Sequence, residues 1–315
     1  MYRVSVVLPN YNHAKFLRQR IDSVLNQSFQ DFELIILDDC SSDNSKEIIE
    51  LYREHPKVSS IIYNNENSGS TFKQWEKGIK AAQGKYVWFA ESDDYADPQF
   101  LEKMVPLLED NEHVGLAFCN SHVIDGAGYI TSNTNTWIGA YEIKQEADKT
   151  TTFNGFQFCL KYLFYTCRIP NASAALFRRE PVINNIHWID TSLRNSGDWK
   201  LWINICLTSD IVWLNQDLNF FRIHGSNVTN SIELLNKEAH LILKDLIKRN
   251  HSQKIYESLV IWSFKSAPWV NGFTINVANI KRYFENNRSL KSGFYLITYL
   301  NKQFIISMKK RMSSY

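Results

Sequence analysis

The stretch YVWFAESDD, residues 86–94, decides the fold of this chain. Its first five residues are largely apolar and predict a buried strand, and three carboxylates follow within four positions. Open α/β sheets bind their ligands at the C-terminal ends of the strands. Because Glu91, Asp93 and Asp94 would repel one another, their spacing favours a divalent metal cofactor, Mg²⁺ or Mn²⁺. The alternative is a solvated acidic turn, since Asp and Ser are common turn residues.

On the N-terminal side of this stretch, apolar segments alternate with segments of helical periodicity. Residues 4–8, 32–37 and 58–63 predict strands, and residues 14–26, a short segment from about 44, and residues 70–82 predict helices. We expect Pro9 to stop the first strand. Strands that alternate with helices in this way form βαβ crossovers, so the sequence predicts an α/β fold with a mainly parallel sheet.

Polar side chains follow three of these strands and should meet at one edge of the sheet. Tyr11 comes just after the first strand, Asp39 just after the second, and the acids at 91–94 after the fourth. Tyr11 offers a flat face on which a base could stack, and Asp39 could accept the imide N–H of a uracil. Taken singly, a half-buried aromatic residue and a helix-capping acid are the plainer interpretations. Taken together, these residues predict a site for a nucleotide and a metal.

The C-terminal part of the chain is more varied. It predicts, in order, a helix at about 98–110, a strand at 114–119, a partly looped insertion at 125–152, a helix at 153–164, a strand at 172–177, a helix at 199–207 and two short strands at 211–214 and 218–221. Trp199, Trp202 and Trp213 either line a sugar pocket or belong to the core, and their spacing favours the core.

The composition is that of a globular protein with a sizeable core, with 44% hydrophobic and 22% charged residues. The formal net charge of +2 gives no field that attracts nucleic acid, so we expect no nucleic-acid partner. The five cysteines are scattered without a C-x-x-C pair, which argues against disulfides and structural zinc. No signal-peptide pattern and no membrane-spanning apolar run occur, so a cytoplasmic location is expected.

Four segments carry a resemblance to a known family: VSVVLPNYN at 4–12, QSF at 27–29, FELIILDDCSSD at 32–43 and ESDD at 91–94. Over about residues 1–225 the chain resembles the family 2 glycosyltransferases with the GT-A fold. The resemblance implies a mainly parallel, mixed sheet with helices on both faces. It also implies a UDP- or dTDP-sugar donor and metal-assisted transfer, with inversion, to a glycan or lipid-linked glycan acceptor.

The resemblance also assigns roles around the donor. It implies that Pro9, Tyr11 and Asp39 hold the base and ribose, and that Asp93 is the metal ligand of the D-x-D motif, with Asp94 beside it. The first Asp of that motif is Glu91 here, so its role is the least defined. The remaining expected donor contacts are Asn12, Ser92 and Lys73, although Lys73 could equally belong to a solvated helix face.

Two later segments complete the expected site. The family places an E-D pair at the start of a late helix, and Gly197-Asp198-Trp199 matches it with Gly in place of Glu. The resemblance therefore implies that Asp198 is the general base. LNFFRIHG, residues 218–225, resembles the family's R-x-H segment, in which Arg222 would bind the diphosphate and His224 the metal. For His224, ordinary packing is the competing interpretation.

We expect a catalytic domain at residues 1–230, with a nucleotide-binding half at about 1–120 and an acceptor half at about 121–230. Residues 231–315 read as a helical, basic C-terminal region. From residue 281 onward it carries eight Lys and Arg residues against Glu285 alone. Such a segment suits contact with the inner face of a membrane, whereas packing on the catalytic domain is the alternative.

Two other functions compete with glycosyl transfer as interpretations of this sequence. A nucleotidyltransferase also uses paired acids on an α/β sheet, but it would require a Gly-rich phosphate loop after the first strand, and PNYN at 9–12 is not one. A non-catalytic sugar-nucleotide binder, or an assembly partner in a glycan-synthesis complex, remains the alternative, because Glu91 and Gly197 depart from the family pattern.

Overall fold

The computed structural model describes residues 2–134, 146–164 and 167–225, followed by residues 234, 237–239, 241–242 and 245–246. The chain divides into two compact units, Met1–Ala239 and His240–Tyr315. Almost all of the predicted helical, basic region lies outside the described residues, so it stays a prediction, as does the boundary near residue 230. Within the residues that are described, no helix is both long and apolar enough to cross a membrane.

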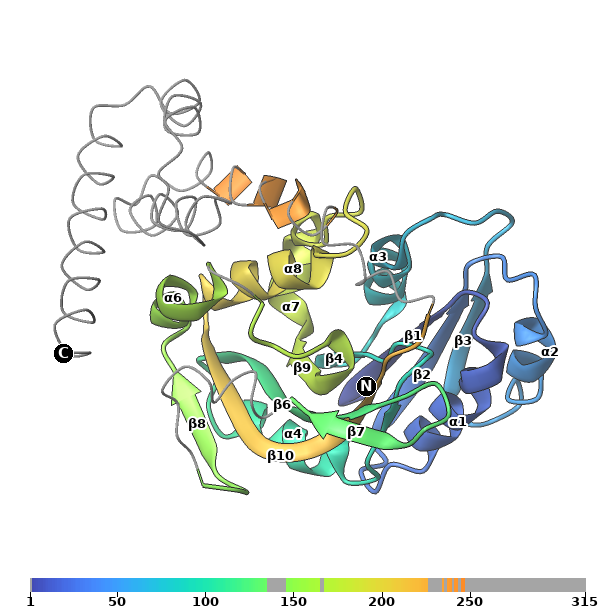
Figure 1. The fold of residues 1–315 in the computed structure, drawn as a ribbon, viewed down its shortest axis with the longest axis horizontal. Coiled ribbons are helices and arrows are strands. Elements are labelled where there is room, and N and C mark those ends of the chain that lie inside the picture. The colour runs from blue at the N-terminus through green and yellow to red at the C-terminus, as the bar shows by residue number, and fades with distance from the viewer. Residues whose placement is uncertain are drawn as a thin grey trace, which may run out of the picture. The chain divides into compact units, whose positions relative to one another are not determined.

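The first half of the sheet is parallel, and strands alternate with helices along the chain (Figure 1). Its elements are β1 (Val4–Asn10), α1 (Ala14–Leu25), β2 (Phe32–Asp38), α2 (Ser45–Glu50), β3 (Val58–Tyr63), α3 (Thr71–Ala81) and β4 (Tyr86–Phe89). The strands lie in the order β3-β2-β1-β4, with Val4 of β1 opposite Phe32 on one side and Tyr86 on the other. The carboxyl ends of β1, β2 and β4 therefore meet at one edge.

The second half extends the sheet through β9, β6, β10 and β5. Its elements are β5 (Tyr95–Ala96), α4 (Phe100–Glu109), β6 (Val114–Ile124), β7 (Ile130–Asn133), β8 (Thr150–Phe153), α6 (Gly155–Phe158), the π-helix η1 (Cys159–Leu163), the 3-10 helix η2 (Ala172–Ala174), β9 (Ala175–Arg178), α7 (Arg179–Asn184), the 3-10 helix η3 (Ile186–Trp188), α8 (Gly197–Cys206) and β10 (Asp210–Arg222). β9 runs antiparallel to β4 and β6, so the sheet is mixed.

Helices cover both faces of this sheet. On one face, Val4, Val6 and Leu8 of β1 pack with apolar residues of α1 and α4 in a single buried cluster. On the other face, Val7 of β1 lies directly against Gly78 of α3. Further along the same face, Trp202 of α8 contacts Phe177 of β9 with a centroid distance of 5.8 Å. The prediction of a mixed, mainly parallel GT-A-type α/β sheet covered on both faces is confirmed.

Some element boundaries differ from the sequence prediction. β1 continues through Pro9, because the Pro9 nitrogen faces the β4 side beyond the last β1–β4 pair, where no ladder bond is lost. The two strands expected at 211–214 and 218–221 are one strand, β10, with register shifts near Asp217. The segment 153–164 begins as the end of β8 and continues through a π-helix, and 172–177 begins as a 3-10 turn.

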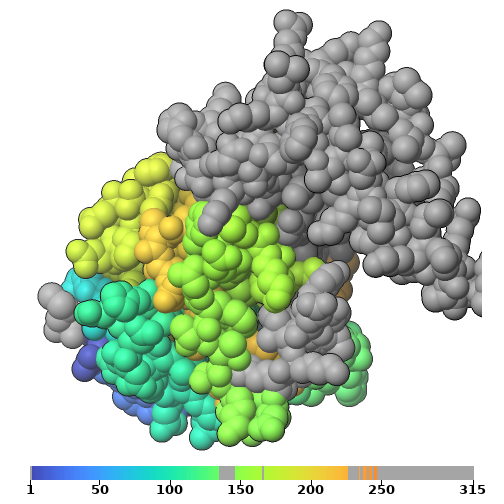
Figure 2. All heavy atoms as spheres, turned by 90° about the vertical axis from the view of Figure 1, so that its left-hand side faces the viewer, coloured from blue at the N-terminus to red at the C-terminus, as the bar shows by residue number. Residues whose placement is uncertain are grey.

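The insertion at 125–152 contributes two short strands to the sheet. β7 pairs with β6, and β8 pairs with β10. Figure 2 views this side of the molecule, where the orange of β10 shows between green and teal residues of neighbouring segments. The three tryptophans considered for a sugar pocket are buried in the core, at 4% exposure or less: Trp199, Trp202 and Trp213.

Candidate active site

The acidic turn lies at the carboxyl end of β4, as the sequence predicted. Ser92 and Asp94 are buried, and Glu91 and Asp93 are partly exposed. The turn is tied to η2, the 3-10 helix that precedes β9, by the Glu91 N–H, which donates to the Ser173 hydroxyl at 3.2 Å. The rigid strand thus holds these acids at the edge of the sheet rather than leaving them in a solvated loop.

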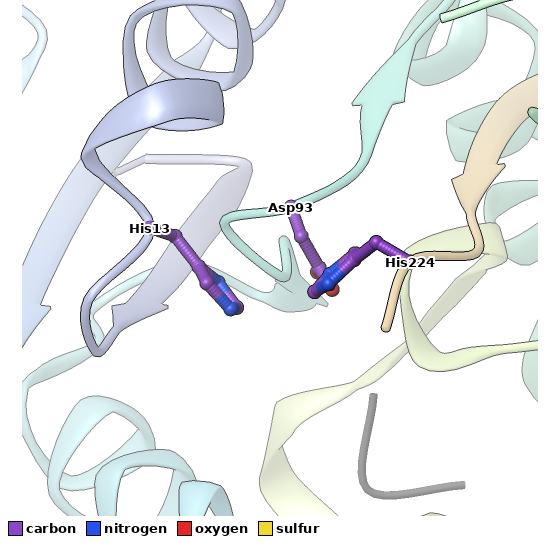
Figure 3. A group of neighbouring side chains, drawn as sticks. All are labelled: His13, Asp93 and His224. Atoms are coloured by element: carbon purple, nitrogen blue, oxygen red, sulfur yellow. The ribbon is translucent and has the colours of Figure 1, made fainter. Parts of the chain in front are cut away.

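Three side chains from distant parts of the chain meet at this turn. His13 precedes α1, Asp93 follows β4 and His224 follows β10, and Figure 3 shows the three side chains pointing toward one another. One potential ligand atom from each lies within 4.8 Å of the others. His224 Nε2 is 3.0 Å from Asp93 Oδ2, and His13 Nδ1 is 2.8 Å from Ser92 Oγ, which leaves His13 Nε2 for a cation.

The protonation of this cluster suits a metal ion. Burial lowers the pKa of His13 below its ordinary value, which favours the neutral imidazole, although the charge of Asp93 opposes the shift. Burial would raise the pKa of Asp93, but the hydrogen bond and charge of His224 and the charge of His13 hold it below its usual range. Neutral imidazole nitrogen and an ionised carboxylate are the forms that bind metals.

Asp94 and Arg222, expected at the metal and at the diphosphate, are instead joined to each other. The Arg222 backbone N–H donates to Asp94 Oδ1 at 2.9 Å. The guanidinium of Arg222 is buried and donates to Asp93 O, Asp125 O and Gln19 Oε1. Both residues lie beside the metal cluster, where they fix the segment that carries His224. Their contacts with a donor or a metal remain predictions.

Glu91 is held as a neutral acid. Trp75 Nε1 donates to its Oε1 at 2.7 Å, and Thr71 lies within 3.4 Å of both oxygens. Burial is the main cause that raises the pKa of Glu91 to about 8, and the charge of Asp93 adds to it, whereas the Trp75 hydrogen bond opposes it. Glu91 therefore contributes a carboxylic acid rather than a charge at neutral pH, which distinguishes it from Asp93.

Asp39, at the end of β2, is buried among hydrogen-bond donors. Its oxygens accept hydrogen bonds from the Ser68 N–H and hydroxyl at 2.9 and 2.7 Å and from Gln74 Nε2 at 2.9 Å, and Asn64 Nδ2 is a further donor. Tyr11, at the end of β1, is 45% exposed and presents its ring to solvent. The structure thus places both residues at the same sheet edge, as expected for a base-binding pair.

The neighbouring loop has a strained backbone that brings two strand ends together. Asn12 has φ of +55°, a conformation that Asn tolerates better than most residues. Its side-chain Oδ1 accepts the N–H of Ser42 at 2.7 Å, and its own N–H donates to Ser41 Oγ. Pro9 is buried just before it. Asn12 therefore joins the loops after β1 and β2, which positions Tyr11.

Asp198 lies in the first turn of α8 and is partly exposed. Its Oδ1 accepts the Trp199 N–H at 2.7 Å. Burial raises the pKa of Asp198 to about 6, against the opposing effect of the backbone N–H groups of Trp199 and Asp198 itself. A carboxylate with this pKa is ionised at neutral pH and is a stronger proton acceptor than an ordinary Asp.

The first turn of α3 connects the acidic turn with the start of α8. Thr71 and Trp75 contact Glu91, and the Phe72 ring lies against Gly197. Lys73, on the same turn, is exposed and donates to the Ser68 carbonyl at 2.8 Å. It lines a hollow of about 420 Å³ together with residues of the loops at 68–70 and 191–194. The structure thus leaves both interpretations of Lys73 in place.

Sequence reasoning missed several residues of this site. His13 stood in a polar loop, and only its position at a strand end, like Asp39 and Asp93, could have indicated a ligand. Gln74 and Trp75, which hold Asp39 and Glu91, looked like ordinary helix positions. The one indication in the sequence is that Gln74 and Trp75 are adjacent in a helix, so their side chains can reach two different strand ends.

Comparison with known proteins agrees with this geometry. The family model described as glycosyl transferase family 2 matches residues 5–184. Chondroitin synthase of Escherichia coli is 25% identical over 272 residues, which cover 85% of this chain and 34% of that protein. The chain spans between 30% and 66% of the lengths of five curated relatives that it matches.

Solved structures share the fold. The crystal structure of TarS 1-349 from S. aureus in complex with UDP-GlcNAc is similar with a TM-score of 0.65 at 19% identity, over 95% of this chain and 80% of that one. The mannosyltransferase PcManGT of Pyrobaculum calidifontis, in complex with GDP-Man and Mn²⁺, is similar with a TM-score of 0.59 at 14% identity, over 96% and 88% of the two chains.

Proposed function

The chain belongs to glycosyl transferase family 2, and from this premise we propose that it is a glycosyltransferase. It transfers a sugar from a UDP- or dTDP-type donor to a hydroxyl of a glycan or lipid-linked glycan, with inversion at the anomeric carbon. The observation that carries the proposal is the meeting of His13, Asp93 and His224 at the sheet edge where β2 also ends beside Asp39. The UDP-GlcNAc complex of a protein with this fold supports the donor class.

The donor is proposed to lie along the sheet edge, from Asp39 toward the acidic turn. Tyr11 stacks on the base and Asp39 accepts its imide N–H, with Pro9 and Asn12 shaping the loop. Ser92 and Glu91 lie on the way to the diphosphate, and Lys73 supplies a cation at the entrance. A carboxylate already surrounded by donors costs little reorganisation when a base replaces one of them.

The residues present fit a divalent metal. Two imidazoles and one carboxylate favour Mn²⁺ over Mg²⁺, because Mg²⁺ prefers oxygen ligands and retains its water shell. His13, Asp93 and His224 would hold the ion, with Asp94 behind Asp93. When bound, the ion offsets the negative charge of the departing diphosphate. The similar mannosyltransferase fold that binds Mn²⁺ supports this choice.

Asp198 is proposed to act as the general base. It takes the proton from the acceptor hydroxyl while that oxygen forms its bond to the anomeric carbon, and the bond from this carbon to the diphosphate oxygen breaks. Attack from the side opposite the leaving group inverts the configuration. A pKa of about 6 keeps Asp198 ionised at neutral pH and ready to accept this proton.

The acceptor and the cellular location of the protein are proposed from the same family membership. We propose a growing surface polysaccharide or lipopolysaccharide chain as acceptor, since a relative of this chain is a chondroitin synthase. The basic sequence from residue 281 supports action in the cytoplasm at the inner face of a membrane. Sedimentation with vesicles that contain anionic lipid, compared with neutral vesicles, tests the membrane contact.

The proposal is tested with a panel of nucleotide sugars in the presence of Mn²⁺. One donor should raise the melting temperature of the protein and release free nucleoside diphosphate, by transfer or by slow hydrolysis. Asp198→Asn should retain the thermal shift but lose most of the release. Stabilisation without any release would instead identify a sugar-nucleotide binder, and no response to any nucleotide sugar would refute the donor class.

A further inference from the structure

At the N-terminal end of α8, which carries Asp198, the residue before the helix provides no side-chain cap. Ser196, the residue before the helix, makes no side-chain capping bond, and no described residue hydrogen-bonds its buried hydroxyl. Gly197 has no side chain, and the Phe72 ring occupies the space where one would begin. Helix starts normally receive a side-chain acceptor from the preceding residue. Within α8, Asp198 Oδ1 accepts the Trp199 N–H, but the segment that leads into the helix must be held from elsewhere in the fold.

Glu238 holds the segment that leads into the helix. Its Oε1 accepts the Arg194 N–H at 2.7 Å, and its Oε2 accepts the N–H groups of Asn195 and Ser196 at 3.0 and 2.7 Å. Glu238 is only 4% exposed, so its charge is compensated by these three donors rather than by water. Removal of the carboxylate would leave three successive amides without their partner. One side chain thus fixes the backbone that leads directly into Asp198.

We propose that Glu238 is a positioning residue for the general base: it fixes the start of α8 so that the Asp198 carboxylate is aimed at the acceptor hydroxyl, and it keeps a negative charge beside that carboxylate. The assignment rests on the proposed role of Asp198. Glu238 touches no substrate in this scheme. It acts through the three amides and through its field.

The electrostatic part follows from the groups that surround Asp198. Burial is the main cause of its raised pKa, and the charge of Glu238 adds to the effect of burial. The Cys167 thiol also faces Asp198, but burial and the Asp198 charge raise the pKa of this thiol well above its ordinary value, so it stays neutral. Lys200, on the same helix, is paired with Asp190 at 2.6 Å. Glu238 is therefore the acid whose removal should lower the pKa of Asp198.

The experiment compares Glu238→Gln and Glu238→Asp with wild type in release of nucleoside diphosphate from the donor, from about pH 5 to about pH 8. Glu238→Gln should lower kcat about tenfold, as loss of an orienting partner commonly does, and leave the donor KM within about twofold. The acid limb of the pH profile, in which the rate falls as Asp198 becomes protonated, should move to lower pH in Glu238→Gln. Glu238→Asp retains the charge, so its limb should stay at the wild-type pH while kcat falls. Glu47→Gln, which removes an exposed carboxylate from α2, is the matched control and should change nothing.

Other outcomes separate this inference from the proposed function. Glu238→Gln could lower the melting temperature and reduce kcat by the same factor at every pH, with no shift of the acid limb. Glu238 is then only a structural cap, and the inference is overturned. If Glu238→Gln does not fold, Glu238→Asp decides, because an unchanged kcat in that variant refutes positioning. A wild-type protein that releases no nucleoside diphosphate contradicts the proposed function itself. An active wild type, an inactive Asp198→Asn and an unaffected Glu238→Gln contradict this inference alone.

Discussion

Gly197 lies directly against the Phe72 ring, which leaves no room for a side chain: a Cβ at position 197 would lie 2.7 Å from the ring carbons of Phe72. The ring is held in place, because it is 3% exposed and packs edge-on against Trp75 at a centroid distance of 5.0 Å. Trp75 in turn stacks on Phe89 of β4 at 4.1 Å. The Glu that the family pattern places before the base is therefore excluded by packing, and α8 begins directly against α3.

This contact predicts a strong coupling between the two positions. Gly197→Ala should lower the free energy of unfolding by about 1–3 kcal/mol, because the methyl group must displace a buried ring. In a Phe72→Ala background the same substitution should cost much less. Urea unfolding of the two single variants and the double variant gives the coupling energy directly.

Gly225→Ala is the matched control, since a Cβ at that position meets no atom of the described residues within 4 Å. It should leave the free energy of unfolding nearly unchanged. Strictly additive costs of Gly197→Ala and Phe72→Ala would show that the ring and the new methyl group do not collide.

The metal cluster predicts that Mn²⁺ binds before the donor. Three protein side chains can reach the ion, so the protein should bind Mn²⁺ without any nucleotide. His13→Ala removes one nitrogen ligand and should weaken this binding about 10- to 100-fold. Electron paramagnetic resonance of free Mn²⁺, titrated with nucleotide-free protein, measures both affinities.

His187→Ala serves as the control, because His187 is exposed and lies in η3. Its affinity for Mn²⁺ should equal that of wild type. If His13→Ala binds Mn²⁺ as tightly as wild type, His13 is not a ligand, and the ion depends on Asp93 and His224 together with the donor.

The acidic turn could be predicted from the sequence because its signal is local. An apolar run followed at once by acids places Asp93 at a strand end, and helical spacing before it places that end in a parallel sheet. Tyr11 and Asp39 were found in the same way. Each of these residues lies within a few positions of the strand that carries it.

His13, Glu238 and the course of β10 could not be found in this way, because their roles depend on tertiary contacts. A histidine in a polar loop becomes a ligand candidate only when β10 brings His224 beside Asp93. Glu238 looks like an ordinary helix acid until its three amide partners are seen. The polar residues near Asp217 indicated a break between strands, whereas paired neighbours on β6 carry the strand through.

Glu91 predicts a pH dependence of stability. Its pKa is raised from the ordinary 4.5 to about 8, chiefly by burial. Between these values the folded protein binds a proton that the unfolded chain has lost, so the contribution of Glu91 to stability is fully present below about pH 4.5 and is lost as the pH rises toward 8. Glu91→Gln is neutral at every pH and still accepts the Trp75 N–H, so its melting temperature should fall less than that of wild type over this window.

The measurement is thermal unfolding in chelator at several pH values, since a bound cation would change the charge of the site. Glu47→Gln, at an exposed position, should follow the wild-type curve. Parallel curves for Glu91→Gln and wild type would show that Glu91 is already ionised in the folded protein.

Asp198 predicts the acid limb of activity. Burial raises its pKa to about 6, so the carboxylate becomes protonated, and loses its capacity as a base, as the pH falls through about 6. The rate of nucleoside diphosphate release at saturating donor and Mn²⁺ should fall tenfold for each pH unit below that point and level off above about pH 7. Asp198→Asn should release the diphosphate about 10²- to 10⁴-fold more slowly, with no limb near pH 6, while its donor affinity stays close to wild type.

Asp190→Asn is a useful comparison, because it removes a nearby acid that is paired with Lys200 and whose pKa lies below its ordinary value. It should keep the limb near pH 6. A limb that persists unchanged in Asp198→Asn would assign the titrating base to another residue.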